Sequence, residues 1–152
     1  MTKEQFTAQV LSAEEMLYKV AMTMLRNEDD ALDAIQNAVL RAYERLDTLK
    51  KEEYFRTWVT RILINVCNRQ LRLRKKTAAY HETQQAAASP QEAAEVRAAV
   101  EGLPMKLRQV VVLYYMQDFS TKEIASILRI PKGTVLSRLS RARELLKAEL
   151  DD

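Results

Sequence analysis

Residues 120–147, STKEIASILRIPKGTVLSRLSRARELLK, predict two short helices separated by a tight break. In the first half, three apolar residues are spaced to share one face of a helix: Ile124, Ala125 and Leu128. Thr121 is the expected N-cap, because a threonine hydroxyl can accept a hydrogen bond from an N–H of the first turn. Pro131 disfavours helical geometry at the residue before it, so we expect the second helix to begin near Lys132.

The second half has an apolar stripe and an opposite face of different composition. The stripe follows intervals of four, three and four residues: Val135, Leu139, Ala142 and Leu146. The outward face carries Thr134, Ser137 and Arg141, flanked by Arg138 on one side and Arg143 on the other, and Lys132 lies where the helix begins. Residues 129–143 contain five basic residues and no acid. This layout is typical of a helix-turn-helix, which can read base edges in the major groove through such side chains. A surface helical hairpin with solvated arginines is the alternative.

The composition of the whole chain predicts an all-α protein. Its 152 residues include only two glycines and three prolines, which leaves little room for β-turns. No apolar run approaches the ~18 residues of a membrane span, and the first residues lack the layout of a signal peptide. One cysteine, Cys67, and one histidine, His81, cannot form a zinc site. We therefore expect no metal, no cofactor, no membrane insertion and no enzymatic activity, and a single cysteine suits the reducing cytoplasm.

Two amphipathic helices are expected at the start of the chain. The first covers residues 2–26, with these residues on its buried side: Phe6, Val10, Leu17, Val20, Ala21, Met24 and Leu25. Asp29 or Asp30 is the expected cap of the second helix. Its large apolar residues recur at helical spacing and predict the buried side: Leu32, Ile35, Val39, Tyr43 and Leu46. The other side carries Asp33, Asn37, Arg41 and Glu44, which we expect to be exposed to solvent.

A third helix, expected at about residues 51–76, is the second informative stretch. Its apolar side carries Phe55, Val59, Ile62, Leu63, Val66, Gln70 and Leu73. The opposite side is basic and amide-rich: Arg61, Asn65, Asn68, Arg72 and Lys75, with Arg69 and Lys76 beside it. Residues 54–76 carry seven basic groups and no acid, which favours a nucleic-acid surface over a merely solvated one. Trp58 can either stack on an unpaired base or belong to the core.

The composition changes over residues 77–96, where large apolar residues nearly disappear and three acids replace the basic groups. This segment predicts a flexible linker, with some helix in its Ala-rich parts, between domains at residues 1–76 and 97–152. Pro90 can start a helix that runs to about Glu101. After a corner at Gly102-Leu103-Pro104, residues 105–117 are expected to pack through Leu107, Val110, Val111, Leu113 and Tyr114. The prediction is two small helical domains joined by a tether.

These stretches resemble the extracytoplasmic-function (group IV) sigma factors of bacterial RNA polymerase, and the resemblance covers nearly the whole chain. DDALDAIQNAVLRAYERL resembles the region 2 helix that binds the polymerase clamp, and FRTWVTRILINVCNRQLRLRKK resembles the helix that melts and reads the −10 element. LPMKLRQVVVLYYMQDFSTKEIASILRIPKGTVLSRLSRARELL resembles region 4, which reads the −35 element. By matching position, Asn65 would lie at the pocket for a flipped −10 base.

The resemblance assigns further residues and partners. Trp58, Arg61, Asn68, Arg69, Arg72 and Lys75 would belong to the −10 surface with Asn65. The outward residues that follow Pro131 would face the −35 element. Asp33, Asn37 and Arg41 would meet core RNA polymerase, and an anti-sigma factor is a further candidate partner, since family members are often restrained by one.

Three departures from the family pattern concern these contacts. Leu32 and Asn37 stand where acids are common, and Leu136 stands where a basic residue is common. The polymerase contact and the −35 specificity are therefore expected to differ in detail. Because the sequence ends soon after the recognition helix, we expect no added C-terminal domain.

The resulting hypothesis is a sigma factor that brings core polymerase to promoters and helps to open them. A stand-alone helix-turn-helix regulator is the main alternative, although it would leave the basic face of residues 54–76 unexplained. A helical scaffold with an incidental basic surface is the third possibility.

Overall fold

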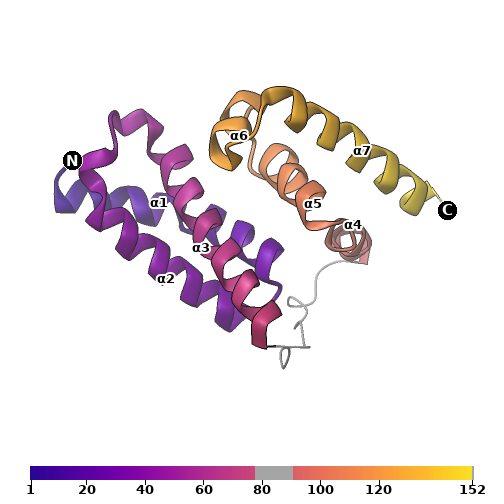
Figure 1. Cartoon of the computed structure of the whole chain (residues 1–152), viewed down its shortest axis with the longest axis horizontal. Helices are drawn as coiled ribbons and strands as arrows, with labels where there is room; N and C mark the ends of the chain where they lie inside the picture. Colours follow the sequence, from indigo (N-terminus) through magenta and orange to yellow (C-terminus); the bar gives the residue numbers. More distant parts are fainter. Residues whose placement is uncertain (78–90, 152) are drawn as a thin grey trace. The chain divides into compact units, whose positions relative to one another are not determined.

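The computed structural model describes residues 1–77 and 91–151. The chain divides into two compact units, Met1–Gln85 and Ala86–Asp152. Both are built from helices, without a strand among the described residues, as Figure 1 shows for each unit. The predicted all-α architecture with two helical domains is thereby confirmed. None of the helices in the described segments is long and apolar enough to cross a membrane.

The first unit is a bundle of three helices, in which each helix packs against the other two. Helices α1 (Lys3–Leu25) and α2 (Glu28–Glu44) are followed by two short 3-10 turns, η1 (Leu46–Thr48) and η2 (Glu52–Tyr54). Helix α3 (Phe55–Thr77) then runs beside α2 (Figure 1). It begins at Phe55 and not near residue 51, because the preceding residues form the tighter η2 turn.

The cap of α2 differs from the predicted one. Arg26 ends α1 in the left-handed conformation, with φ 55°, and Asn27 directly after it is extended. The Asn27 side chain accepts a hydrogen bond from the backbone N–H of Asp30 at 2.9 Å. Asp29 and Asp30 therefore lie inside the first turn, where their charges suit the positive end of the helix dipole.

The buried side of α2 is formed by alanines and not by the large residues that the periodicity predicts. Four alanines are fully buried: Ala31, Ala34, Ala38 and Ala42. Leu32 is 45% exposed and Tyr43 is 46% exposed, while Ile35, Val39 and Leu46 are half-buried. The prediction for this helix was wrong, because side chains without a γ carbon let α2 lie close to α1 and α3. The larger side chains then flank the contact or face solvent.

The core of the first unit otherwise follows the predicted stripes of α1 and α3, with additions. Ala13, Met16, Thr60, Ile64 and Cys67 are buried and were not predicted on those stripes. Val10 and Gln70 are only half-buried, and Leu73 is 52% exposed, so the predicted inward position of Leu73 was wrong. No residue of α3 after Cys67 has a fully buried side chain among those the structure describes. The apolar core thus holds the N-terminal half of α3.

The second unit contains α4 (Gln91–Glu101), α5 (Met105–Val111), the π-helical turn η3 (Val112–Met116), α6 (Thr121–Leu128) and α7 (Lys132–Asp151). Helix α4 includes residues 91–96, which the predicted linker had covered; Pro90, predicted to start this helix, lies outside the described residues. Residues 78–90 of that linker, and His81 with them, lie outside the described residues. Helix α7 packs on α4, α5 and α6.

The core of this unit is contributed by every helix. Its buried apolar residues are Val100, Leu103, Val110, Val111, Val112, Leu113, Phe119, Ile124, Ile127, Val135, Leu139 and Ala142. Leu107 and Leu146 are half-buried, and Tyr114 is 37% exposed, in contrast to their predicted core positions. The tyrosine is displaced because the chain widens to a π-helical turn there, which changes the direction of its side chains.

The helix-turn-helix forms where it was predicted, with one different cap. Ser120 caps α6: its hydroxyl accepts from the N–H of Glu123 at 3.0 Å, and the Glu123 carboxylate accepts from the N–H of Ser120 at 2.8 Å. Thr121 is thus the first residue of the helix and not its cap. Ile127, with Ile124, fills the buried face in place of Ala125 and Leu128, which are half-buried. Arg129 ends α6 in the left-handed conformation.

Candidate nucleic-acid interface

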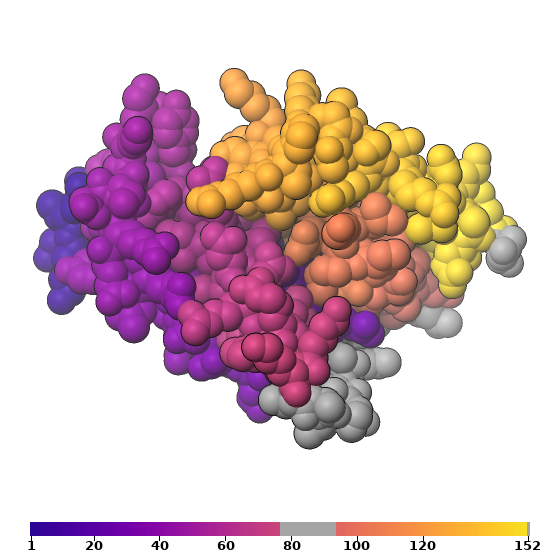
Figure 2. Space-filling view, in the orientation of Figure 1, coloured from indigo at the N-terminus to yellow at the C-terminus, as the bar shows by residue number. Residues whose placement is uncertain are grey.

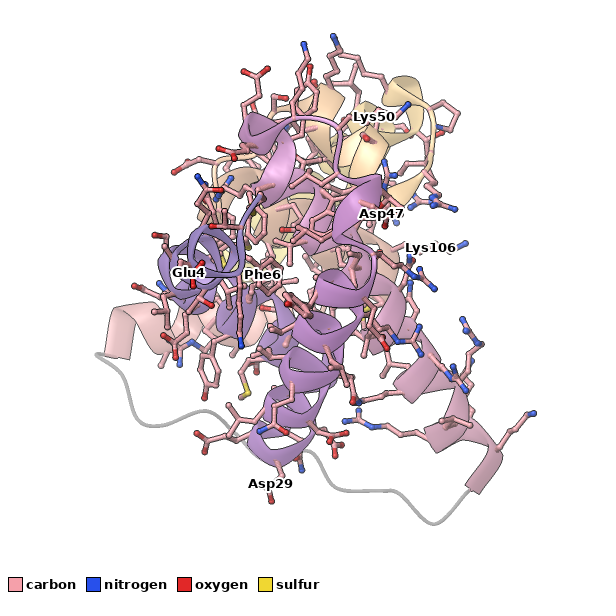
Figure 3. The ribbon with its side chains drawn as sticks, turned by 90° about the vertical axis from the view of Figure 1, so that its left-hand side faces the viewer. Glu4, Phe6, Asp29, Asp47, Lys50 and Lys106 are labelled. Atoms are coloured by element: carbon pink, nitrogen blue, oxygen red, sulfur yellow. The ribbon has the colours of Figure 1, made fainter. Side chains whose placement is uncertain are left out.

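Helix α3 presents a row of amide and basic side chains away from the bundle core. We call this the α3 row: Arg61, Asn65, Asn68, Arg69, Arg72 and Lys75. Asn65, Arg69, Arg72 and Lys75 are exposed, and Arg61 and Asn68 are half-buried. In Figure 3, nitrogen-tipped side chains crowd along the C-terminal half of this helix. The structure thus brings the predicted −10 residues of α3 onto one continuous, positively charged side.

Trp58 is held at the beginning of α3 by contacts within the first unit. Its indole N–H donates a hydrogen bond to the hydroxyl of Thr48 in η1 at 3.2 Å. Its ring packs against Phe55 with 5.8 Å between the centroids. The side chain is half-buried: Trp58 ties η1 to α3 and keeps part of its ring surface exposed.

The C-terminal half of α3 is joined to α2 by two polar contacts that sequence reasoning missed. The guanidinium of Arg74 forms an ion pair with Asp30. The Gln70 amide donates to the carboxylate of Asp33 at 3.3 Å. Asp33, expected to be a solvent-exposed residue of α2, is therefore also a partner of α3. The sequence shows only that the beginning of α2 is acidic and the end of α3 is basic. This opposite charge does not identify which side chains contact each other.

The outer side of α2 is a mixed polar and apolar surface. Asp33 and Asn37 are exposed and Arg41 is half-buried, which agrees with their expected outward positions. Leu32 and Tyr43 are also exposed, together with Leu40, of which 60% is exposed. The two large residues that were wrongly assigned to the core therefore add apolar area to this surface.

Helix α7 presents the second basic row. We call this the α7 row: Lys132, Thr134, Ser137, Arg138, Arg141 and Arg143. Thr134 and Arg138 are half-buried and the other four are exposed. Side chains of α7 form part of the outer surface of the second unit in Figure 2. Leu136 is 48% exposed, so the position where the family commonly has a basic residue is apolar on this surface.

Two arginines of the α7 row already have partners within the protein. Arg141 pairs with Glu144 one turn later at 3.2 Å, and both side chains are more than half exposed. Arg143 donates to the hydroxyl of Tyr115 in η3 at 2.9 Å. An exposed ion pair contributes little to stability, so Arg141 can leave Glu144 for another acceptor at small cost. The Tyr115 contact gives Arg143 a role within the unit that the sequence did not indicate.

The described residues provide little reactive chemistry. Burial raises the pKa of the Cys67 thiol to about 12, which keeps it protonated and unreactive at neutral pH. No group of three or more His, Cys, Asp and Glu side chains that could hold a metal occurs within residues 1–77 and 91–151. The surfaces that stand out are the two basic rows and the outer side of α2.

Two family models match the chain, one in each unit. Sigma-70 region 2 matches residues 10–77, and Sigma-70, region 4 matches residues 93–146. The ECF RNA polymerase sigma factor SigW of Bacillus subtilis is 32% identical, over 91% of this chain and 84% of its own length. The ECF RNA polymerase sigma factor SigM of Mycobacterium tuberculosis is 33% identical, over 86% of this chain and 69% of its own length.

Two solved structures have a similar fold. The sigma factor RpoE, in complex with the anti-sigma factor NepR from Bartonella quintana, gives a TM-score of 0.87 at 24% identity, covering 97% of this chain and 98% of that chain. CnrH, in complex with the cytosolic domain of CnrY, gives a TM-score of 0.77 at 27% identity, covering 99% of this chain and 90% of that chain.

Proposed function

The chain belongs to the extracytoplasmic-function sigma factors of the sigma-70 family, and we propose that its two units read and open promoter DNA through the α3 row and the α7 row. It acts as an RNA polymerase sigma factor and not as a stand-alone regulator, because region 2 and region 4 are both present and in order. As a transcription initiation factor it supplies recognition and leaves catalysis to the polymerase. Its place of action is the cytoplasm, where promoters and polymerase meet.

The α3 row combines two kinds of side chain that suit opened DNA. Exposed arginines and a lysine attract phosphates in a salt-dependent manner that is blind to sequence. Asn65 offers one donor group and one acceptor group, which match the Watson–Crick edge of a base that is no longer paired. This combination on one face of α3 is the observation that carries the proposal. Trp58, whose half-buried ring packs beside Phe55, would stack on an unpaired base.

The α7 row suits the major groove of the −35 element. Arg141 projects from the middle of α7 and is suited to the O6 and N7 atoms of guanine, while Ser137 and Arg138 are one helical turn or less away. The Ser137 hydroxyl donates to the backbone carbonyl of Thr134 at 3.1 Å and keeps its lone pairs for a further partner. Lys132, near the start of α7, supplies a phosphate contact.

Core RNA polymerase meets the outer side of α2 in this proposal. Asp33, Asn37 and Arg41 provide polar contacts, and the exposed Leu32, Leu40 and Tyr43 provide apolar area beside them. Each DNA-reading unit alone would bind weakly. Both become effective when polymerase holds them at the promoter spacing, because linkage raises the effective concentration of the second contact.

An anti-sigma factor is the other proposed partner. The RpoE structure contains the anti-sigma factor NepR, the CnrH structure contains the cytosolic domain of CnrY, and the fold of this chain is similar to those of RpoE and CnrH. A partner of this kind would compete with polymerase for the exposed apolar and charged surfaces described above.

Permanganate footprinting with reconstituted polymerase tests the role of the α3 row. Asn65→Ala should reduce opening of a paired promoter while polymerase binding and −35 recognition remain intact. The defect should shrink on a template already mismatched across the −10 region, unless Asn65 also reads the base, in which case the base preference should weaken on both templates. Arg72→Ala should reduce opening and lower the salt slope of binding by about one.

The matched control is Arg97→Ala, which removes an exposed arginine of α4 outside both rows. It should leave opening and the salt slope unchanged. If Asn65→Ala and Arg72→Ala both open the paired promoter as the parent does, the α3 row is not the melting surface.

A further inference from the structure

The half of α3 that carries most of the α3 row extends beyond the apolar core. The last fully buried side chain of α3 is that of Cys67, and from Asn68 to Lys76 every side chain is half-buried or exposed. Five of these residues are basic: Arg69, Arg72, Arg74, Lys75 and Lys76. Like charges three and four residues apart destabilise a helix. The direction of this segment therefore depends on contacts other than apolar packing.

Polar contacts with the beginning of α2 supply that support. Asp30 and Asp33 are three residues apart on α2, and Arg74 and Gln70 are four residues apart on α3, so each pair of side chains shares one face of its helix. Arg74 pairs with Asp30, and their side chains are only 16% and 35% exposed. Gln70 donates to Asp33 at 3.3 Å. We call these four residues the α2–α3 clasp.

We propose that the α2–α3 clasp positions the C-terminal half of α3 for the promoter strand, with Asp30 as its main anchor. This inference rests on the proposed DNA role of the α3 row. Asp30 does not touch DNA: it acts through Arg74. A partly buried, charge-assisted contact fixes the direction of a helix better than a fully exposed ion pair does, because solvent screens the partly buried contact less. The clasp thus fixes the direction in which Arg72 and Lys75 project.

The direction in which Asp30→Ala changes promoter opening shows whether Asp30 positions α3 or acts only through its charge. Asp30→Ala removes a negative charge close to a DNA-binding surface, and charge alone predicts tighter binding and better opening. Loss of positioning predicts weaker binding and less promoter opening. We expect promoter opening by the reconstituted holoenzyme to fall on the order of tenfold, the upper range for losing a charged hydrogen bond that is partly exposed.

Asp29→Ala is the matched control. Asp29 precedes Asp30, lies in the same first turn of α2 and is exposed (Figure 3). The change in charge and in helix-dipole interaction is the same in both variants, while the contact with Arg74 remains in Asp29→Ala. This control should open the promoter at least as well as the parent. Gln70→Leu, which removes the contact with Asp33 without changing charge, should reduce opening in the same direction but less.

Hydrogen exchange of the free protein gives a readout that a general loss of stability would not imitate. Asp30→Ala should accelerate exchange of the backbone amides of residues 69–77 while those of residues 59–67 keep their protection. Arg72→Ala should instead lower the salt slope of DNA binding by about one, because it removes a phosphate contact directly.

The outcomes separate this inference from the proposed function. If Arg72→Ala impairs opening but Asp30→Ala behaves like Asp29→Ala, the clasp does not position α3 and the DNA role of the row stands. If Asn65→Ala and Arg72→Ala both open the promoter normally, the DNA role fails and the inference fails with it. Uniformly faster exchange throughout the first unit of Asp30→Ala would also overturn positioning, because it would show a general loss of stability.

Discussion

Substituting leucine for Ala38 places three more carbon atoms at a position with no exposed area, where α2 lies against the rest of the first unit. Inserting such atoms into a packed core typically costs about 1–3 kcal/mol. We expect the upper part of that range, about 2–3 kcal/mol, because helix backbones on both sides limit relaxation. Leu40→Ala is the control. It removes three carbon atoms from a side chain that is 60% exposed, so it should lower the free energy of unfolding by less than about 1 kcal/mol.

Urea unfolding followed by tryptophan fluorescence measures both variants. Trp58 is the only tryptophan of the chain, so its signal reports the first unit alone. With a slope of about 1–1.5 kcal/mol per molar urea for a unit of this size, Ala38→Leu should lower the midpoint by more than about 1 M. An unchanged midpoint for Ala38→Leu, combined with a large loss for Leu40→Ala, would refute the alanine-lined packing of α2.

Two further predictions concern the buried thiol and the α7 row. The pKa of Cys67 is raised from 9.0 to about 12, so the folded state keeps a proton that the unfolded chain releases. The free energy of unfolding should therefore fall by up to about 1.4 kcal/mol per pH unit above roughly pH 9, and urea titrations at pH 8 and 10 should show a smaller fall in Cys67→Ala. Arg141→Gln should weaken −35 binding by about 1–3 kcal/mol in footprinting with holoenzyme, and Arg143→Gln should weaken it less, because Arg143 bonds to Tyr115. Equal losses for both arginines would contradict this ranking.

Periodicity predicted α7 well and α2 poorly for a physical reason. In α7 the largest apolar residues and the buried stripe coincide at Val135 and Leu139, and Pro131 marks the beginning of the helix. In α2, a stripe of large residues and a stripe of alanines lie side by side, one position apart. The distance between neighbouring helices decides which of the two is buried. A single sequence does not contain that distance, so the larger residues were favoured.

The candidate site could be predicted as far as the choice of helix face. Exposed positions such as Asn65, Arg72 and Arg141 follow from the period of a helix once its apolar side is known. Contacts between helices do not follow in this way. Arg74 and Asp30 are 44 positions apart, and Arg143 and Tyr115 are 28 apart. Several acids or tyrosines would be equally good partners by residue type, and only the packed structure selects among them.

Asp33 links the two proposed roles of the first unit. Its carboxylate accepts from Gln70 of α3, while its position on the outer side of α2 places it in the proposed polymerase surface. A polymerase group that draws Asp33 away from Gln70 would loosen one half of the α2–α3 clasp and leave Asp30 with Arg74. One that binds Asp33 while Gln70 stays in place would instead reinforce it. Because linkage is reciprocal for binding free energies, any change in promoter affinity caused by polymerase implies an equal change in polymerase affinity caused by the promoter. If both proposed roles hold, the Asp33 carboxylate would couple recognition of promoter and polymerase by the first unit.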